Sequence, residues 1–182
     1  MASELRVDKI VPTDGVPTNG GGGIIQVIFA ADSTAASLGT FTNNGPDTPA
    51  TIMSASITPK FNTSKILVMC KGTVGVDANN VNYEFSLHLS RTVGGTTTRL
   101  GGNTNSSHFK GTHVQASSNQ SAEAPNTTSF QFLDSPATTS SVTYKLQWAG
   151  NSSGYALYLN RYPGGSTSYI GSSSLTVMEV SG

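Results

Sequence analysis

The sequence predicts an all-β fold: an antiparallel β-sandwich of the jelly-roll type that carries an extended N-terminal arm. From residue 24 onward, apolar and polar residues alternate with a period of two, which is typical of strands with one buried and one solvated face. No window of useful length shows a helical period, and the missing helices exclude a parallel βαβ architecture. Eight or nine short strands separated by polar turns favour a sandwich or jelly roll.

The alternation places the individual strands. It is clearest over residues 83–90, where odd positions are apolar and even positions polar, so His88 is expected in solvent. Residues 142–148 alternate in the same way and put Trp148 in the core. The remaining strands are predicted over 24–30, 51–58, 65–74, 91–100, 128–133, 155–160 and 174–180, with the segment 91–100 the weakest. The longest polar interruptions, 32–50 and 101–124, are expected to be loops.

Two parts of the chain are predicted: residues 1–23 as an attachment arm and linker, and residues 24–182 as the β-sandwich head. The linker, residues 12–23, holds Asp-Gly and Asn-Gly turn signals, two prolines and four final glycines, which together make a flexible joint. The short apolar segment before it cannot form a core alone, so it either frays as a disordered tail or docks on another protein as an added strand. We favour docking, through Leu5, Val7, Ile10 and Val11.

The charge pattern excludes several classes of partner. Ten Lys and Arg balance ten Asp and Glu, and charged residues make up 11% of the 182-residue chain. A nucleic-acid-binding protein needs a basic face, but the lysines are scattered singly. No secretory signal or bilayer-spanning stretch is visible, so no membrane insertion is expected. A neutral surface protects poorly against self-association, which suits a permanent part of an assembly.

The sequence gives no support for catalysis, and no cofactor or metal is expected. The glycines at 20–23 lack the Lys-Ser/Thr ending of a phosphate loop. Cys70 stands alone in an apolar strand, where a buried, inert thiol is expected. His108 and His113 lie five residues apart, yet without a nearby carboxylate or cysteine they are a weak signal for a metal. A carbohydrate-active enzyme is the catalytic alternative.

A contact surface is predicted from the aromatic and imidazole side chains outside the apolar phase of the strands. Tyr158 alternates with Leu157 and Leu159 and therefore faces away from the core. Tyrosine is favoured at binding surfaces because it joins a large apolar ring to a polar tip. The candidate residues for contact with a receptor or another subunit are His108, His113, Tyr158, Tyr162 and Tyr169.

Several segments together resemble small tail-fibre-like or head-appendage virion proteins of tailed bacteriophages, especially marine phages. These segments are 5–12, 56–59, 63–68, 132–137, 157–161 and 174–180. They span most of the chain, and their motifs are structural and carry no chemistry. The resemblance implies a β-sandwich head, commonly a homotrimer, which the N-terminal segment attaches to a capsid or tail protein at the virion surface.

Two functions fit this resemblance. In the first, the protein is a non-enzymatic capsid decoration or short head appendage. In the second, it is a tail fibre or receptor-binding adhesin whose loops contact host surface glycans. The sequence contains no shaft repeats or coiled coil between arm and head, which favours the first.

Overall fold

In the computed structural model, the described residues are 23–40, 49–77, 83–101, 113–117, 125–150, 156–162 and 170–181. All regular structure within these ranges is β-strand, which confirms the all-β prediction. The strands are β1 (Ile24–Asp32), β2 (Ala36–Thr40), β3 (Ala50–Ile57), β4 (Lys65–Asp77), β5 (Tyr83–Val93), β6 (Thr96–Leu100), β7 (His113–Ser117), β8 (Asn126–Asp134), β9 (Val142–Gly150), β10 (Ala156–Leu159) and β11 (Ser173–Val180). Within the same ranges, no helix is long and apolar enough to cross a membrane.

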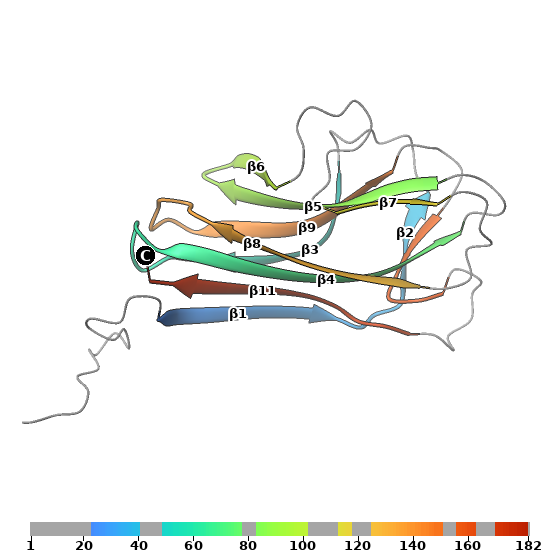
Figure 1. The fold of residues 1–182 in the computed structure, drawn as a ribbon, viewed down its shortest axis with the longest axis horizontal. Helices are drawn as coiled ribbons and strands as arrows, with labels where there is room; N and C mark the ends of the chain where they lie inside the picture. The colour runs from blue at the N-terminus through green and yellow to red at the C-terminus, as the bar shows by residue number, and fades with distance from the viewer. Residues whose placement is uncertain are drawn as a thin grey trace, which may run out of the picture.

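The strands form two antiparallel sheets (Figure 1). Sheet A has the order β1-β11-β4-β10-β2, with β8 on the other side of β4. Sheet B has the order β3-β9-β5-β6, with β7 also paired to β5. The pairs run antiparallel in both sheets, as the alternating pattern predicted.

The pairing is nested along the chain. β1 pairs with β11, β3 with β9, β4 with β8, and β5 with β6 and β7. Strands near the start of the chain therefore pair with strands near its end, and strands nearer the middle of the chain pair with one another. Nested pairing of this kind is what a jelly roll requires, and the jelly-roll form stays our interpretation of the strand order.

The core lies between the two sheets and is built from the apolar phase of each strand. Trp148 and Cys70 are each 3% exposed, so both residues lie in the core as predicted. Each fully buried aliphatic or aromatic side chain contributes about 1.5–3 kcal/mol of hydrophobic stabilisation. The largest apolar contributors are Tyr144, Ile66, Leu87, Leu89, Leu146, Leu157, Leu175 and Val68.

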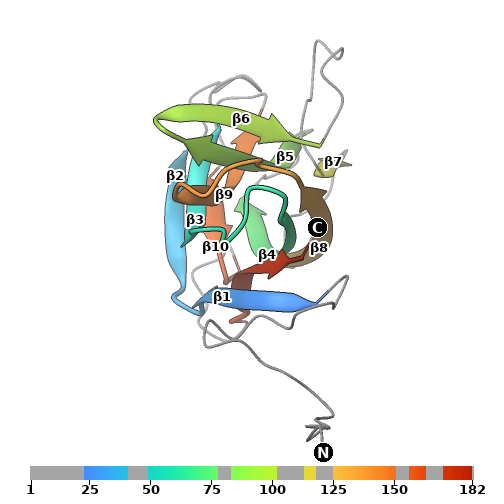
Figure 2. The same ribbon diagram turned by 90° about the vertical axis from the view of Figure 1, so that its left-hand side faces the viewer.

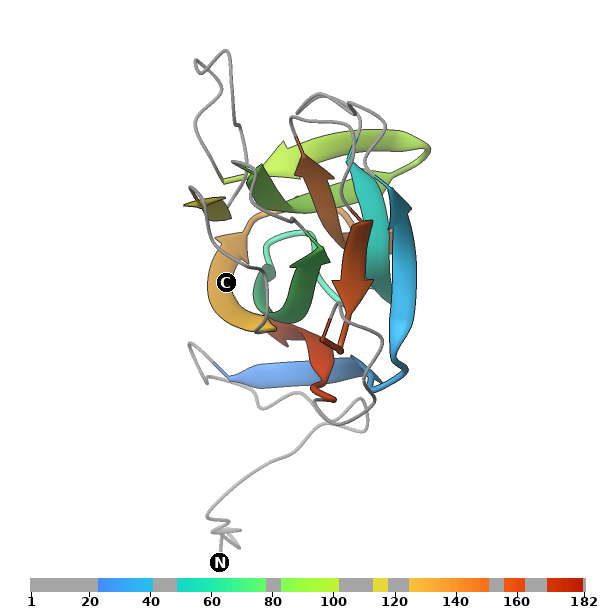
Figure 3. The same ribbon diagram turned by 90° about the vertical axis from the view of Figure 1, so that its right-hand side faces the viewer.

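The molecule has two distinct ends. β1 begins and β11 ends at the same end, where the Ser181 amide donates to the Gly23 carbonyl at 3.0 Å. We call this the proximal end, because residues 1–22 join the chain there. β2 and β10 lie at the opposite, distal end (Figure 1). Views along the strands show β1 and β6 on opposite sides of the molecule (Figures 2 and 3). The predicted arm lies outside the described residues, so the arm and its boundary with the head stay predictions.

The polar face of β5 is not in solvent. Ser86 and His88 have no exposed surface, and Ser90 is 3% exposed. Ser90 Oγ donates to Gln147 Oε1 at 2.6 Å, and Gln147 Nε2 donates to the Pro49 carbonyl at 3.2 Å. The prediction that His88 is solvated is therefore wrong. Alternation separates the two faces of a strand, but a polar face can be buried when its groups are hydrogen-bonded.

Residues 91–100 form a hairpin rather than one strand. β5 continues to Val93, and β6 returns antiparallel from Thr96. Gly94 and Gly95 between them have φ angles of 55° and 83°. Positive φ at both central residues is the geometry of a type I′ hairpin turn, which suits Gly-Gly. The predicted loops 32–50 and 101–124 likewise contain the short strands β2 and β7, whose apolar content is too low to stand out in the sequence.

Candidate functional site

The structure places only part of the predicted site. The side chains of seven predicted residues lie outside the described part of the chain: Leu5, Val7, Ile10, Val11, His108, His113 and Tyr169. The backbone of His113 begins β7 and pairs with Leu87 in sheet B. Tyr158 and Tyr162 lie in and just after β10, in the distal part of sheet A. The roles of all nine residues in docking or contact stay predictions.

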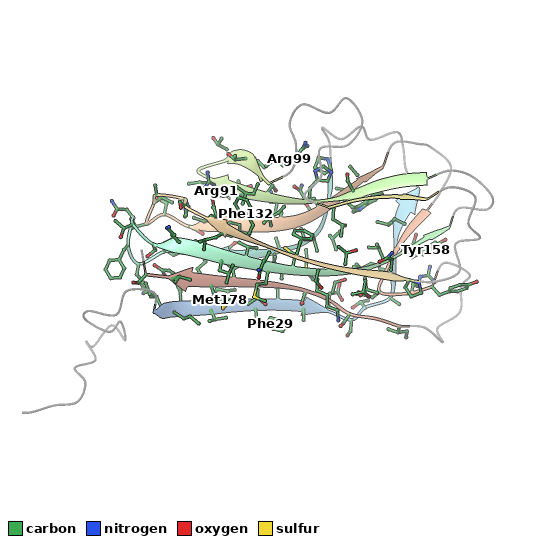
Figure 4. All side chains as sticks on the ribbon, viewed as in Figure 1. Phe29, Arg91, Arg99, Phe132, Tyr158 and Met178 are labelled. Atoms are coloured by element: carbon green, nitrogen blue, oxygen red, sulfur yellow. The ribbon has the colours of Figure 1, made fainter. Side chains whose placement is uncertain are left out.

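Tyr158 is a predicted contact residue whose side chain lies at the distal end (Figure 4). Its neighbours Leu157 and Leu159 are buried, and the half-buried Tyr158 faces the other way, as the alternation predicted. The guanidinium carbon of Arg161 lies 4.4 Å from the centre of the Tyr158 ring. A cation at this distance from a tyrosine face makes a cation–π contact, which orients both side chains. The role of Arg161 could not be predicted from the sequence, because no short motif marks the turn that brings its side chain back to Tyr158.

Asn160 holds the turn that carries Arg161. It is fully buried and has a φ of 57°, in the left-handed region that few residues other than glycine adopt. Its Nδ2 donates to the Asp32 carbonyl at 2.8 Å and to the Thr34 carbonyl at 3.3 Å. Asparagine tolerates this backbone conformation and supplies the amide that satisfies one carbonyl at the end of β1 and one just after it.

The same asparagine closes a gap in sheet A. β11 and β10 pair with the same side of β4, over residues 65–71 and 74–77 respectively. Between these segments, the Asn160 amide donates to the Thr73 carbonyl at 2.9 Å, and the Thr73 amide donates to Ser173 Oγ at 3.0 Å. Ser173 Oγ in turn donates to Asn160 Oδ1 at 2.8 Å. We call this network the β10–β11 junction.

One serine and one histidine form the only arrangement among the described residues that invites comparison with a hydrolase. Ser86 Oγ lies 2.6 Å from His88 Nε2, which is the distance of a nucleophile hydrogen-bonded to its base. Neither side chain has exposed surface, so a substrate has no access to the hydroxyl. The pair therefore fits a role in satisfying buried polar groups better than a role in catalysis.

A charged cluster ties the two sheets together near the proximal end. Arg91 of β5 donates from Nη1 to both carboxylate oxygens of Asp134 on β8, at 2.8 and 2.9 Å. The hydroxyl of Tyr144 on β9 donates to Asp134 Oδ2 at 2.7 Å. Burial, with the neighbouring carboxylate, raises the pKa of Tyr144 far above its usual range. Arg91 lies 43 residues before Asp134 in the sequence, so no local spacing could have predicted the cluster.

Comparisons with known proteins identify no family. No family model and no curated protein matches the chain. Among solved structures, the infectious bursal disease virus VP2 subviral particle is similar at 14% identity and a TM-score of 0.39, over 98% of this chain and 44% of that one. The Gt and Gx strains of the same virus are similar at 14% identity, with TM-scores of 0.38 and 0.36. The chain spans less than half the length of these proteins, and a likeness this distant carries no functional argument.

The fold and the described side chains define the chain as an antiparallel, all-β protein in two sheets. Several of its buried polar groups are hydrogen-bonded within the fold: Asp134 and Asn160 join strands, and Glu179 accepts from the Lys60 amide at 2.7 Å. Among the described residues, no three His, Cys, Asp or Glu side chains gather at a spacing that could hold a metal ion.

Proposed function

We propose that the chain is a non-enzymatic structural protein of a bacteriophage virion. It acts as an oligomeric β-sandwich knob that its N-terminal arm attaches to the particle, as a capsid decoration or short head appendage. The observation that carries this proposal is the two-ended build of the head. The chain enters at the proximal end beside the last strand, and Tyr158 lies at the far end. A knob that is anchored to a particle needs its point of attachment and its exposed contact residues at opposite ends.

The chemistry of the described residues supports a structural role. Asp134 and Glu179 are 5% and 0% exposed, and each is hydrogen-bonded between strands. The thiol of Cys70 is buried as well, and burial raises its pKa to about 12, so it is a poor nucleophile at neutral pH. The resemblance of the sequence to phage head-appendage proteins adds independent support for a place on the particle.

A truncation tests the attachment. Particles lacking this protein are incubated with the full chain or with residues 24–182, and bound protein is quantified after sedimentation. We expect the full chain to bind and the truncated chain to lose at least tenfold in bound protein, because Leu5, Val7, Ile10 and Val11 are absent. A single full-length variant with Val7→Asp and Ile10→Asp should behave like the truncation. Equal binding of full and truncated chains would refute the role of the arm.

A second function, a tail fibre or glycan-binding adhesin, is favoured by the Tyr158–Arg161 pair. Aromatic rings bind the apolar faces of sugars, and a guanidinium binds carboxylates in a planar, two-bond geometry. The number of copies per particle separates the two functions. Many tens to hundreds of copies indicate capsid decoration, whereas a handful or a dozen-odd indicate the tail. A Tyr158→Ala variant that abolishes adsorption to host cells would support the adhesin.

A further inference from the structure

The outer face of sheet A carries an unusual amount of exposed apolar surface. Phe29 is 65% exposed, Leu133 53%, Val27 51% and Met69 43%. These four side chains come from β1, β8 and β4, which belong to one sheet. Isolated exposed apolar residues are ordinary, but a contiguous apolar patch marks an interaction surface.

The register shows that these side chains are contiguous. Val27 pairs with Met178, Met178 with Leu67, and Leu67 with Leu133, which makes one apolar row across all four strands β1, β11, β4 and β8. The next row on the same face consists of Phe29, Thr176, Met69 and Gln131. Figure 4 shows Phe29 and Met178 along the side of the molecule that β1 and β11 form.

The charges lie away from the centre of this face. Among the described side chains of these four strands, Lys65 and Lys71 are the charged ones on this side, and they flank the two rows along β4. A shallow groove of about 390 Å³ lies beside Lys71 and Met69 and is lined further by Ser129, Ser174 and Thr176. An apolar centre with a polar rim is the usual build of a protein–protein interface.

We infer that the outer face of sheet A is the surface through which copies of this chain associate. The inference deepens the proposed function, because it names the contact that makes the knob oligomeric. Strands lie about 4.8 Å apart and rise about 3.3 Å per residue, so a face four strands wide and as long as the 8 residues of β11 is about 500 Å² in projection. Stable complexes bury about 800 Å² per partner, so this face supplies the larger part of an interface.

A second copy fits the face better than the other occupants. The arm is predicted to add one short strand, which would cover about a quarter of the width of four strands. A nucleic acid is disfavoured because two lysines neutralise few phosphates. Two copies of the chain carry no net charge, since ten basic and ten acidic residues balance, so they meet without overall repulsion.

A pair of matched variants tests the inference on the full chain. Phe29→Thr combined with Leu133→Thr removes two strongly exposed apolar side chains of the face, one on each edge strand. Phe61→Thr combined with Ile170→Thr is the control, because these residues are 42% and 56% exposed but lie outside the strands of this face. Mass is measured by light scattering at micromolar concentration, with a thermal melt to check folding.

We expect the wild type and the control to be oligomers and the face variant to be a folded monomer. Phe29→Leu with Leu133→Val keeps the face apolar and should keep the oligomer. An oligomeric face variant, a control that also dissociates, or a monomeric wild type would each overturn the inference. Particle attachment of the same variants is scored separately, so a virion protein that associates through another surface is distinguishable from one that is absent from the virion.

Discussion

At the scale of single residues, burial decides the chemistry of the polar and nucleophilic groups. Cys70 was predicted as a buried, inert thiol, and its 3% exposure confirms the burial. His88 shows the opposite case, since its polar strand position predicted exposure and it is buried beside Ser86. What differs is a partner: the Ser86 hydroxyl and the His88 ring lie 2.6 Å apart, and such pairing lets polar groups leave water.

The burial of Cys70 predicts a dependence of stability on alkaline pH. Its pKa is about 12 in the folded chain and 9.0 in the unfolded reference, so between these values the folded state holds more protons. The protonated Cys70 thiol therefore makes its full contribution to the free energy of unfolding below pH 9. That contribution is lost as pH rises from 9 towards 12, at up to about 1.4 kcal/mol per pH unit. A Cys70→Val variant lacks this contribution. Urea unfolding at pH 7 to 10.5 should show a steeper decline for the wild type, and parallel declines would contradict the prediction.

At the scale of elements, the β10–β11 junction is the feature on which sheet A most depends. Two strands share one side of β4 there, and Asn160 and Ser173 supply the hydrogen bonds that a continuous strand would otherwise make. The close contact between Gly171 and Thr73 adds to this dependence. A Cβ on Gly171 would lie 2.5 Å from Thr73 Cγ2, so only glycine fits beside the threonine.

Two substitutions separate the roles of Asn160. Asn160→Gly keeps the left-handed backbone at φ 57° but removes the side-chain hydrogen bonds. The Asp32 carbonyl and the Ser173 hydroxyl then lose their Asn160 partners. We expect a loss of about 3 kcal/mol in the free energy of unfolding. Asn160→Ala should lose about 1 kcal/mol more, because alanine also resists this conformation. Chemical denaturation measures both, and a loss under 1 kcal/mol for both variants would show that the junction is dispensable.

The sequence predicts elements well where they are long and alternate strictly. Strands β4, β5, β9 and β11 appear where the pattern placed them, because their apolar phase forms the core. Short β2 and β7 escape prediction, because pairing with neighbouring strands creates them rather than their own pattern. The Asp134 cluster also escapes, because Arg91 lies 43 residues from Asp134 in the sequence. The contact of Arg161 with Tyr158 escapes because it depends on the left-handed turn at Asn160.

At the scale of the whole molecule, the nested pairing joins the two termini of the head. β1 and β11 are the first and last strands, and they pair over eight register positions from Ile24 to Asp32. The structure can close only when the last strand is present. Folds dominated by such distant pairings form slowly, in about milliseconds to seconds. We therefore regard the head as one cooperative unit that begins at β1.

This view makes a sharp prediction about truncation. Removing residues 1–23 should change the free energy of unfolding by less than about 0.5 kcal/mol, within the range of changes that touch no packed element. Removing residues 1–28 should be severe. It deletes Gln26, whose Nε2 donates to Glu179 Oε2 at 2.5 Å and to the Thr58 carbonyl at 2.7 Å, and it leaves a buried carboxylate short of a donor.

Urea unfolding and stopped-flow refolding of the two truncated chains measure this difference. The chain of residues 24–182 should refold at the wild-type rate, because every register position between β1 and β11 remains and only the hydrogen bond from Ser181 to Gly23 is lost. The chain of residues 29–182 should lose several kcal/mol or fail to fold, since half of that ladder and the donor to Glu179 are gone. A large loss on removing residues 1–23 alone would mean that the arm packs against its own head. Leu5, Val7, Ile10 and Val11 would then be occupied within the chain, which would argue against their docking on the particle.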